Sequence, residues 1–384
     1  MHSLALFLNK TGGTRQSESK LSLRSLALFL NKTGGTRQSE SKLSLRSLAL
    51  FLNKTGGARQ SESKLSLHSL ALFFTKNRIG MKEKLDFDAM AQRLLQSGRR
   101  RRVAVAAPED AHTEEVIDRC MREGIADFVL FARREKAETA ERIAGTCPGH
   151  AVTVTADTPE ETARMAVKAV REGQADVLMK GTLNTDVLLR AVLDKENGLL
   201  IPGRTLSHIT ATQIPQYGKL LLFADAAVIP HPDTEQFDAI LRYALNIFRK
   251  LNGHGRTPRV ALIHCTEKTN AKFAHTLSYT ELRRRAAEGR YGRMLIDGPM
   301  DVKTACDSES ARIKGLTSEV TGNADILIFP NIEAANTFYK TITLFAGATT
   351  AGMLCGAVAP VVIASRADSA EAKMCSMLMA CSLA

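Results

Sequence analysis

A chain of 384 residues with 44% hydrophobic and 24% charged residues is long enough to bury one large core or two of medium size. No run of about 18 apolar residues occurs in it, so the sequence predicts no membrane-spanning helix. A net charge of +12 would indicate a nucleic-acid partner if it were evenly spread, but residues 1–80 carry +10 of it. We therefore expect neither nucleic acid nor membrane as a partner of the rest of the chain.

Residues 1–80 form a tandem repeat. The unit SLALFLNKTGGTRQSESKLSLR occurs three times, almost unchanged, between Ser3 and His68. Each unit has one short apolar segment and a Gly-Gly break, which gives it little to pack against. We interpret residues 1–80 as duplicated upstream sequence, non-native or disordered, with Met81 as the expected start. A basic interaction arm and a targeting peptide are the alternatives.

From Arg101 onward, short apolar runs alternate with amphipathic stretches, which is typical of βαβ units and a mostly parallel sheet. The predicted strands are Val103–Ala106, Asp127–Ala132, Val152–Thr155, Asp176–Met179, Lys219–Phe223, Arg259–His264, Met294–Ile296, Asp325–Phe329 and Val361–Ala364.

Helices are predicted between these strands. Thr158 followed by Pro159 and two glutamates indicates a capped helix from Pro159 to Glu172. Asp233 caps a second helix that runs to about Leu251, and the last helix begins at Asp368 or Ser369.

Nine strands over some 300 residues exceed one ordinary doubly wound sheet, so we expect two α/β lobes that share a cleft. The first lobe comprises residues 81–217 and 356–384, and the second comprises residues 218–355. The candidate hinges are Gln213–Gly218 and Gly347–Ala359.

The seven cysteines all follow residue 80 and form no C-x-x-C pair. This pattern favours a reducing cytoplasm and argues against structural zinc or a disulfide framework. Signatures of nucleoside-triphosphate binding, serine hydrolysis, zinc proteolysis and classical dinucleotide binding are also missing from the sequence.

Polar clusters at predicted strand ends remain as candidates for chemistry. Lys180, Gly181 and Thr182 follow a strand and open a helix, a geometry that binds an oxyanion on backbone N–H groups; the alternative is an ordinary turn with a solvated lysine. Ser365 and Arg366 combine a hydroxyl and a guanidinium at a strand end that faces a helix start. We expect the chemistry there.

Further candidates are weaker when they are taken singly. Arg204 lies in a turn, where it serves as a phosphate fork or as a surface residue. Asp225 is better explained by structural pairing, although orienting an arginine is the alternative. Asp297, with Gly298 in the turn after it, lies at another strand end, where it holds a ligand hydroxyl or caps the turn. Asn336 and Lys340 share one helical face near the start of a helix.

Taken in order, these segments resemble the phosphate acetyl/butyryltransferases. The resemblance extends over residues 81–384, and the Leu-Met-Lys-Gly and Ser-Arg-Ala-Asp-Ser variants are more similar to the butyryl branch. It is carried by the segments LMKG (178–181), GRT (203–205), FADAAV (223–228), LIDGP (295–299), IFPN (328–331), NTFYK (336–340) and SRADS (365–369).

The resemblance implies an isocitrate/isopropylmalate-dehydrogenase-like fold, a homodimer or higher homo-oligomer, and no metal or nicotinamide cofactor. It implies reversible transfer of an acyl group between coenzyme A and inorganic phosphate, with acyl-CoA, coenzyme A and phosphate as substrates. It assigns site roles to Ser365, Arg366 and Arg204. In the acetyl branch an aspartate is credited as the base that deprotonates the coenzyme A thiol. This chain has Ala372 at that position, so we assign no base.

Direct attack of the thiol on an acyl phosphate in a ternary complex fits these residues, because Ser365, Arg366 and Lys180 are suited to hold a developing oxyanion. The substrate-binding candidates beside them are Arg204, Gly181, Thr182, Asp225, Asp297, Gly298, Asn336 and Lys340. Alternatives are a phosphate acetyltransferase, a metal-dependent dehydrogenase of the same fold and a non-catalytic acyl-CoA-binding module.

Overall fold

The computed structural model describes residues 85–253, 255–365 and 368–384, which belong to one compact unit. Residues 1–80 and Arg366 lie outside the described residues, so the interpretation of the repeats and the role of Arg366 stay predictions.

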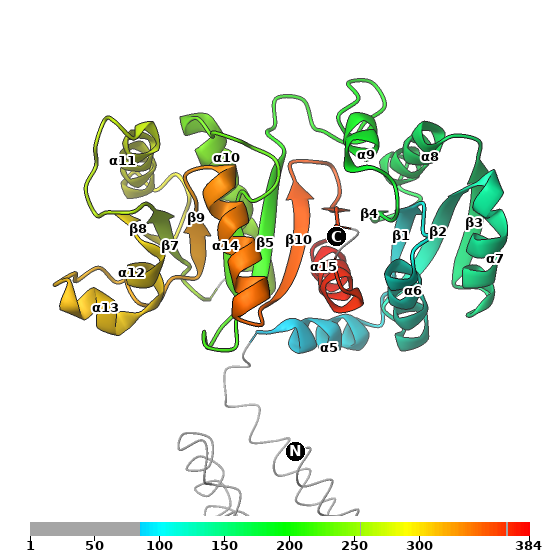
Figure 1. Cartoon of the computed structure of the whole chain (residues 1–384), viewed down its shortest axis with the longest axis horizontal. Coiled ribbons are helices and arrows are strands. Elements are labelled where there is room, and N and C mark those ends of the chain that lie inside the picture. The colour runs from blue at the N-terminus through cyan, green and yellow to red at the C-terminus, as the bar shows by residue number, and fades with distance from the viewer. Residues whose placement is uncertain (1–84, 254, 366–367) are drawn as a thin grey trace, which may run out of the picture. The chain divides into compact units, whose positions relative to one another are not determined.

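Within this part of the chain, eleven strands form one sheet in the order β3-β2-β1-β4-β11-β10-β5-β6-β9-β7-β8 (Figure 1). The strands are β1 (Arg101–Ala106), β2 (Ala126–Arg133), β3 (Ala151–Ala156), β4 (Val177–Lys180), β5 (Ser207–Gln213), β6 (Leu221–Ala224), β7 (Arg259–Ile263), β8 (Leu295–Met300), β9 (Ile326–Ile328), β10 (Thr349–Cys355) and β11 (Val361–Val362).

The two flanks of the sheet are parallel, and antiparallel strands join them at the centre. Strands β3, β2, β1, β4 and β11 run in one direction, and β6, β9, β7 and β8 run in the other. Between the flanks, β10 is antiparallel to β11 and β5, and β5 is antiparallel to β6. We call the β10–β5 pair the central seam.

Helices cover both faces of this sheet (Figure 1). One face packs on α5, α6, α7, α10, α11 and α15 through a single large cluster of apolar side chains. The opposite face has two separate clusters, with α8 and α9 over one flank and α12 and α14 over the other. The helices are α5 (Phe87–Ser97), α6 (Ala111–Glu123), α7 (Ala137–Gly145), α8 (Pro159–Arg171), α9 (Thr185–Val192), α10 (Thr234–Asn252), α11 (Ala274–Ala287), α12 (Val302–Cys306), α13 (Ser308–Ile313), α14 (Ile332–Phe345), α15 (Ala370–Leu383) and the 3-10 turn η1 (Arg134–Lys136).

The predicted α/β class, with helices layered on a large sheet, is confirmed, and so are the helix starts. The side chain of Thr158 caps α8 by accepting the Glu161 N–H at 3.1 Å. Asp233 caps α10 in a capping box with Gln236, and Ser369 caps α15. These ends are formed by local hydrogen bonds, which is why the sequence alone locates them.

The prediction for the centre of the sheet was wrong in two respects. Residues 347–359, expected to be a hinge, contain β10, and β5 was not predicted at all. The other expected hinge, residues 213–218, connects β5 to β6. The division into two lobes at residues 217/218 and 355/356 stays a prediction.

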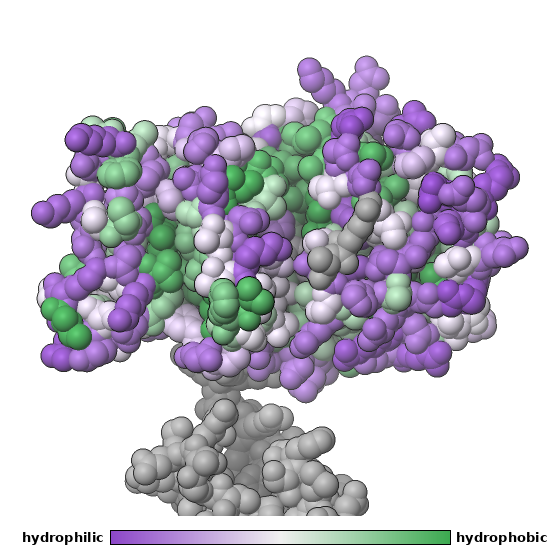
Figure 2. Space-filling model, viewed as in Figure 1, coloured by the Kyte–Doolittle hydropathy of each residue, from purple (hydrophilic) through white to green (hydrophobic). Residues whose placement is uncertain are grey.

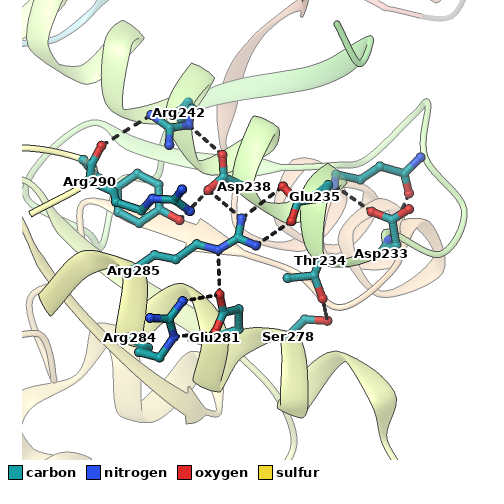
Figure 3. Close-up of polar contacts among 12 residues, drawn as sticks. Asp233, Thr234, Glu235, Asp238, Arg242, Ser278, Glu281, Arg284, Arg285 and Arg290 are labelled. Carbon is teal, nitrogen blue, oxygen red and sulfur yellow. Dashed lines mark hydrogen bonds and ion pairs between the residues drawn. The ribbon is translucent and has the colours of Figure 1, made fainter. Parts of the chain in front are cut away.

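A network of ion pairs fixes α11 against α10 (Figure 3). The side chain of Arg285 is 10% exposed and contacts Glu235 and Asp238 of α10 and Glu281 of its own helix. Asp238 also accepts hydrogen bonds from Arg242 at 2.6 Å and from the Tyr291 hydroxyl at 2.7 Å.

The surface of the face in view is mostly polar, with an apolar patch at the carboxyl end of α14 (Figure 2). Leu344 and Phe345 lie there and are 74% and 80% exposed. None of the described helices has the length and apolar content needed to cross a bilayer.

Candidate active site

A cavity of about 450 Å³ opens on the face of the sheet that carries two separate helix clusters, over the central seam. Its floor consists of side chains from β5 and β10, and its walls come from α14 on one side and the β4–α9 turn on the other. The residues after β11 and the first turns of α15 close one end. The site therefore lies where neither helix layer covers the sheet.

The floor is polar because the alternate residues of the seam strands face it. His208 and Thr210 of β5 and Thr350 and Gly352 of β10 line the cavity. Their neighbours in sequence, such as Ile209, face the opposite apolar layer. Successive side chains of a strand point to opposite faces, so this half-polar alternation defines a site on one side and a core on the other.

Lys180 lies at the end of β4 and lines the cavity, and its role in the reaction stays a prediction. Its side chain is 2% exposed, and Nζ donates to the carbonyl oxygens of Gly181 at 3.0 Å and Leu183 at 3.2 Å. A buried ammonium held in this way supplies positive charge to the cavity.

Ser365 lines the same cavity, three residues after β11. Its backbone N–H donates to the Asp368 carboxylate at 2.7 Å, which closes the short loop before α15. Ser365 is exposed, and its position next to the cavity agrees with a substrate-contacting hydroxyl. Arg366 follows directly in the chain but falls in the undescribed gap at residues 366–367.

Asn336 and Lys340 project from one face of α14 into the cavity. Asn336 Nδ2 donates to the Ala226 carbonyl oxygen at 3.0 Å, which ties α14 to the segment after β6. Lys340 is exposed, and its Nζ lies 4.5 Å from the ring centroid of Tyr339. The structure thus brings together Lys180, Ser365, Asn336 and Lys340.

Gly181 and Thr182 have a different role from the expected anion cradle. Their backbone N–H groups donate to the carbonyl oxygens of Ala106 and Ala107, both at 2.8 Å, and so are not directed at a ligand. A Cβ on Gly181 would lie 1.8 Å from the Ala107 oxygen, so glycine is required for the close approach of two strand ends.

Arg204 is exposed and is not among the cavity-lining residues. Its charge lies close enough to Tyr243 to lower the pKa of that hydroxyl, although burial raises that pKa more.

Asp225 serves the backbone instead of a ligand. Its carboxylate is 2% exposed and accepts four hydrogen bonds, from the Ser207 hydroxyl and from the N–H groups of His208, Ala227 and Val228. Both oxygens are occupied, so its contribution to the site is to hold the start of β5 and the segment after β6 together.

Asp297 and Gly298 line a second cavity of about 280 Å³, on the edge strand β8. Strands β6, β9 and β7 separate β8 from the seam. Arg283 contacts the Asp297 carboxylate at 3.2 Å and the Gly298 carbonyl oxygen at 3.0 Å. The structure does not unite these two residues with the main site.

His208, Tyr339 and Asp368 also line the cavity. The sequence analysis assigned no site role to His208 or Tyr339 and placed Asp368 at a helix start beside Ser365. Burial lowers the pKa of His208, although the nearby carboxylates of Asp225 and Asp368 act to raise it. Burial also raises the pKa of Tyr339; Asp368 acts in the same direction and Thr350 in the opposite one. The signal for His208 was the polar–apolar alternation of residues 207–213, which becomes informative once β5 is assigned.

Ala372, at the position where the acetyl branch carries an aspartate, lines the cavity with a methyl group. No grouping of three or more His, Cys, Asp or Glu side chains suited to a metal ion occurs among residues 85–253, 255–365 and 368–384.

Comparisons with known proteins identify relatives of the chain. Residues 145–381 match the family described as phosphate acetyl/butaryl transferase. A probable phosphate butyryltransferase of Bacillus subtilis is 35% identical over 72% of this chain and 91% of its own length. A phosphate acetyltransferase of Thermotoga maritima is 34% identical over 73% of this chain and 95% of its own length. The crystal structure of a branched-chain phosphotransacylase from Enterococcus faecalis superposes with a TM-score of 0.63 at 27% identity, covering 73% of this chain and 98% of that one.

The fold and the family match define an α/β enzyme of the phosphate acyltransferase class. The chain belongs to the phosphate acetyl/butyryl transferase family, since the family match covers more than half of it and the relatives align over nearly their whole length.

Proposed function

We propose that the protein transfers a short-chain acyl group reversibly between coenzyme A and inorganic phosphate, with butyryl favoured. The observation that carries this proposal is the cavity over the seam, where the cationic Lys180 and Lys340 and the hydroxyl of Ser365 meet in a chain of this family. Two anionic substrates and a developing oxyanion require this kind of lining.

Direct transfer in a ternary complex is supported by the placement of the cysteines. None of the described cavity-lining residues is a cysteine. Cys355, the last residue of β10, is buried, and burial raises the pKa of its thiol to about 12. A protonated buried thiol is a poor nucleophile, so we propose that coenzyme A attacks the acyl phosphate carbonyl itself.

A preference for butyryl over acetyl is supported by the apolar part of the cavity. Leu183, Ile363 and Ala227 line it beside the polar groups, and an alkyl chain gains about 0.8 kcal/mol for each CH₂ that it buries. The chain is similar to a probable phosphate butyryltransferase and to a phosphate acetyltransferase, so the preferred acyl-chain length has to be measured.

The test is phosphate-dependent release of coenzyme A from acetyl-, propionyl- and butyryl-CoA. We expect release from all three, with the highest kcat/KM for butyryl-CoA. We also expect Arg366→Ala to reduce kcat/KM by about 10²-fold or more if its guanidinium orients phosphate as the resemblance implies. Binding of coenzyme A without any phosphate-dependent release would favour a non-catalytic binding module and refute the proposal.

We further propose that the protein forms a homodimer or a higher homo-oligomer, as the family resemblance implies. Light scattering on the purified protein measures the mass directly, and a monomer at assay concentration would contradict this part of the proposal.

A further inference from the structure

The proposed reaction requires a group that removes the proton of the coenzyme A thiol. An ordinary thiol has a pKa of about 8.5, so only about 3% of it is ionised at pH 7. The cavity holds the titratable side chains that can serve, and the described ones are Lys180, His208, Tyr339, Lys340 and Asp368.

The cationic and phenolic groups are poor proton acceptors in this setting. Lys180 Nζ donates its protons to two backbone carbonyl oxygens, as an ammonium does. Lys340 lies over the Tyr339 ring, where a positive charge is favoured. Burial raises the pKa of Tyr339, so its hydroxyl remains protonated at neutral pH.

Asp368 already has a role in holding the loop. Its carboxylate accepts the Ser365 N–H at 2.7 Å. That hydrogen bond engages the carboxylate in the loop, so Asp368 is tested below as the alternative base.

His208 is placed differently. Its backbone N–H is fixed by Asp225 at 3.0 Å, and its ring Nδ1 lies 3.3 Å from the Thr210 hydroxyl. The imidazole packs over Gly352, where a Cβ would come within 2.6 Å of Nε2. Glycine at this position makes room for the ring on the cavity floor.

In this arrangement Nε2 is the ring nitrogen that can accept a hydrogen bond from a bound substrate. The Thr210 hydroxyl accepts from Nδ1–H in one tautomer of the ring, which makes Nε2 the acceptor nitrogen. Within the described residues, Nε2 has no hydrogen-bond partner, and the ring lines the cavity together with Ser365 and Lys180.

We propose, building on the acyl-transfer function above, that His208 Nε2 is the base that accepts the coenzyme A thiol proton. The S–H bond breaks as Nε2–H forms, the sulfur electron pair forms the C–S bond, and the acyl C–O bond breaks with its electron pair leaving on phosphate. The imidazolium then gives its proton to the departing phosphate or to water. In the reverse direction the imidazolium protonates the leaving thiolate.

The surrounding charges suit both protonation states of the ring. Burial lowers the pKa of His208, so the resting imidazole is neutral at pH 7 and able to accept a proton. The negative charges of Asp225 and Asp368 act to raise the pKa of His208, and so they stabilise the imidazolium as it forms. Lys180 and Lys340 act on the anionic substrates and on the thiolate.

The test compares the full chain with His208→Gln and Asp368→Asn in the direction that forms acyl-CoA from acyl phosphate and coenzyme A. For His208→Gln we expect kcat at pH 7 to fall about 10²- to 10⁴-fold. The deficit should shrink roughly 20-fold by pH 9, because the thiol then ionises without help. The Kd of coenzyme A should change less than about threefold.

Several results would overturn the inference. These are a His208→Gln activity within about threefold of the parent at pH 7, a deficit that is constant with pH, or a pH-dependent deficit in Asp368→Asn alone. If His208→Gln does not fold, Thr210→Val supplies the answer: we expect kcat to fall about tenfold with KM retained, and an unchanged kcat would refute the proposal. Wild-type protein that shows no acyl transfer would refute the proposed function itself, whereas an active wild type with an active His208→Gln would refute only the base.

Discussion

Replacing Arg285 by alanine tests whether the α10–α11 ion-pair network stabilises the fold (Figure 3). The Arg285 side chain is 10% exposed, and it contacts Asp238, whose side chain is 12% exposed. Removing one partner of a buried ion pair costs about 3–5 kcal/mol, because the other charge is left without compensation. Asp238 keeps Arg242 and Tyr291, and the remaining two partners of Arg285 reach solvent, so we expect a smaller loss of about 2–3 kcal/mol.

Arg284→Ala is the matched control for this change. Arg284 is the neighbouring residue on α11, has the same charge and pairs with Glu281 and Glu288, but its side chain is 55% exposed. Exposed pairs contribute about 0–1 kcal/mol. With a denaturant slope of about 3 kcal/mol/M, urea unfolding should show a midpoint lower by about 0.8 M for Arg285→Ala and by less than about 0.3 M for Arg284→Ala. Equal midpoints for the two variants would refute the reasoning.

Three further predictions concern the sheet and its surroundings. Burial and the adjacent His264 lower the pKa of His275 to about 4 in the folded protein, so protonation of this ring opposes folding. The free energy of unfolding should therefore fall by about 2 kcal/mol between pH 6.5 and pH 4. His275→Gln should flatten that part of the curve of unfolding free energy against pH. Gly352→Ala should displace the His208 ring and lower kcat about tenfold or more while the melting temperature changes little, and an unchanged kcat would contradict the packing argument. Asp225→Asn should lower the free energy of unfolding by about 2–4 kcal/mol in urea titration, because an amide cannot accept all four hydrogen bonds that the carboxylate accepts; a loss under 1 kcal/mol would contradict it.

Helix ends and flanking strands could be predicted from the sequence, because their signals are local. Thr158 and Asp233 mark helix starts through side-chain caps that operate over three residues. The parallel strands are buried on both faces and therefore occur as short apolar runs, as in β4 and β9.

The centre of the sheet could not be predicted in this way. Residues 207–213 alternate polar and apolar side chains, and residues 349–355 place Ala351 and Gly352 in the middle of the strand, where glycine weakens the strand signal. In both strands the small and polar residues face the cavity, so the requirements of the site mask the strand pattern. For the same reason His208 was passed over, whereas Lys180 and Ser365, which follow apolar strands, were found.

The order in which the strands emerge from the ribosome has a consequence for this enzyme. The central strands β10 and β11 and the helix α15 come from the last part of the chain, after both flanks of the sheet have been synthesised. Until then β4 and β5 have open edges, which are prone to pair with other chains. The cavity over the central seam also lacks one side of its floor until that moment. We therefore expect a chain that ends before β10 to lose both its stability and the cavity.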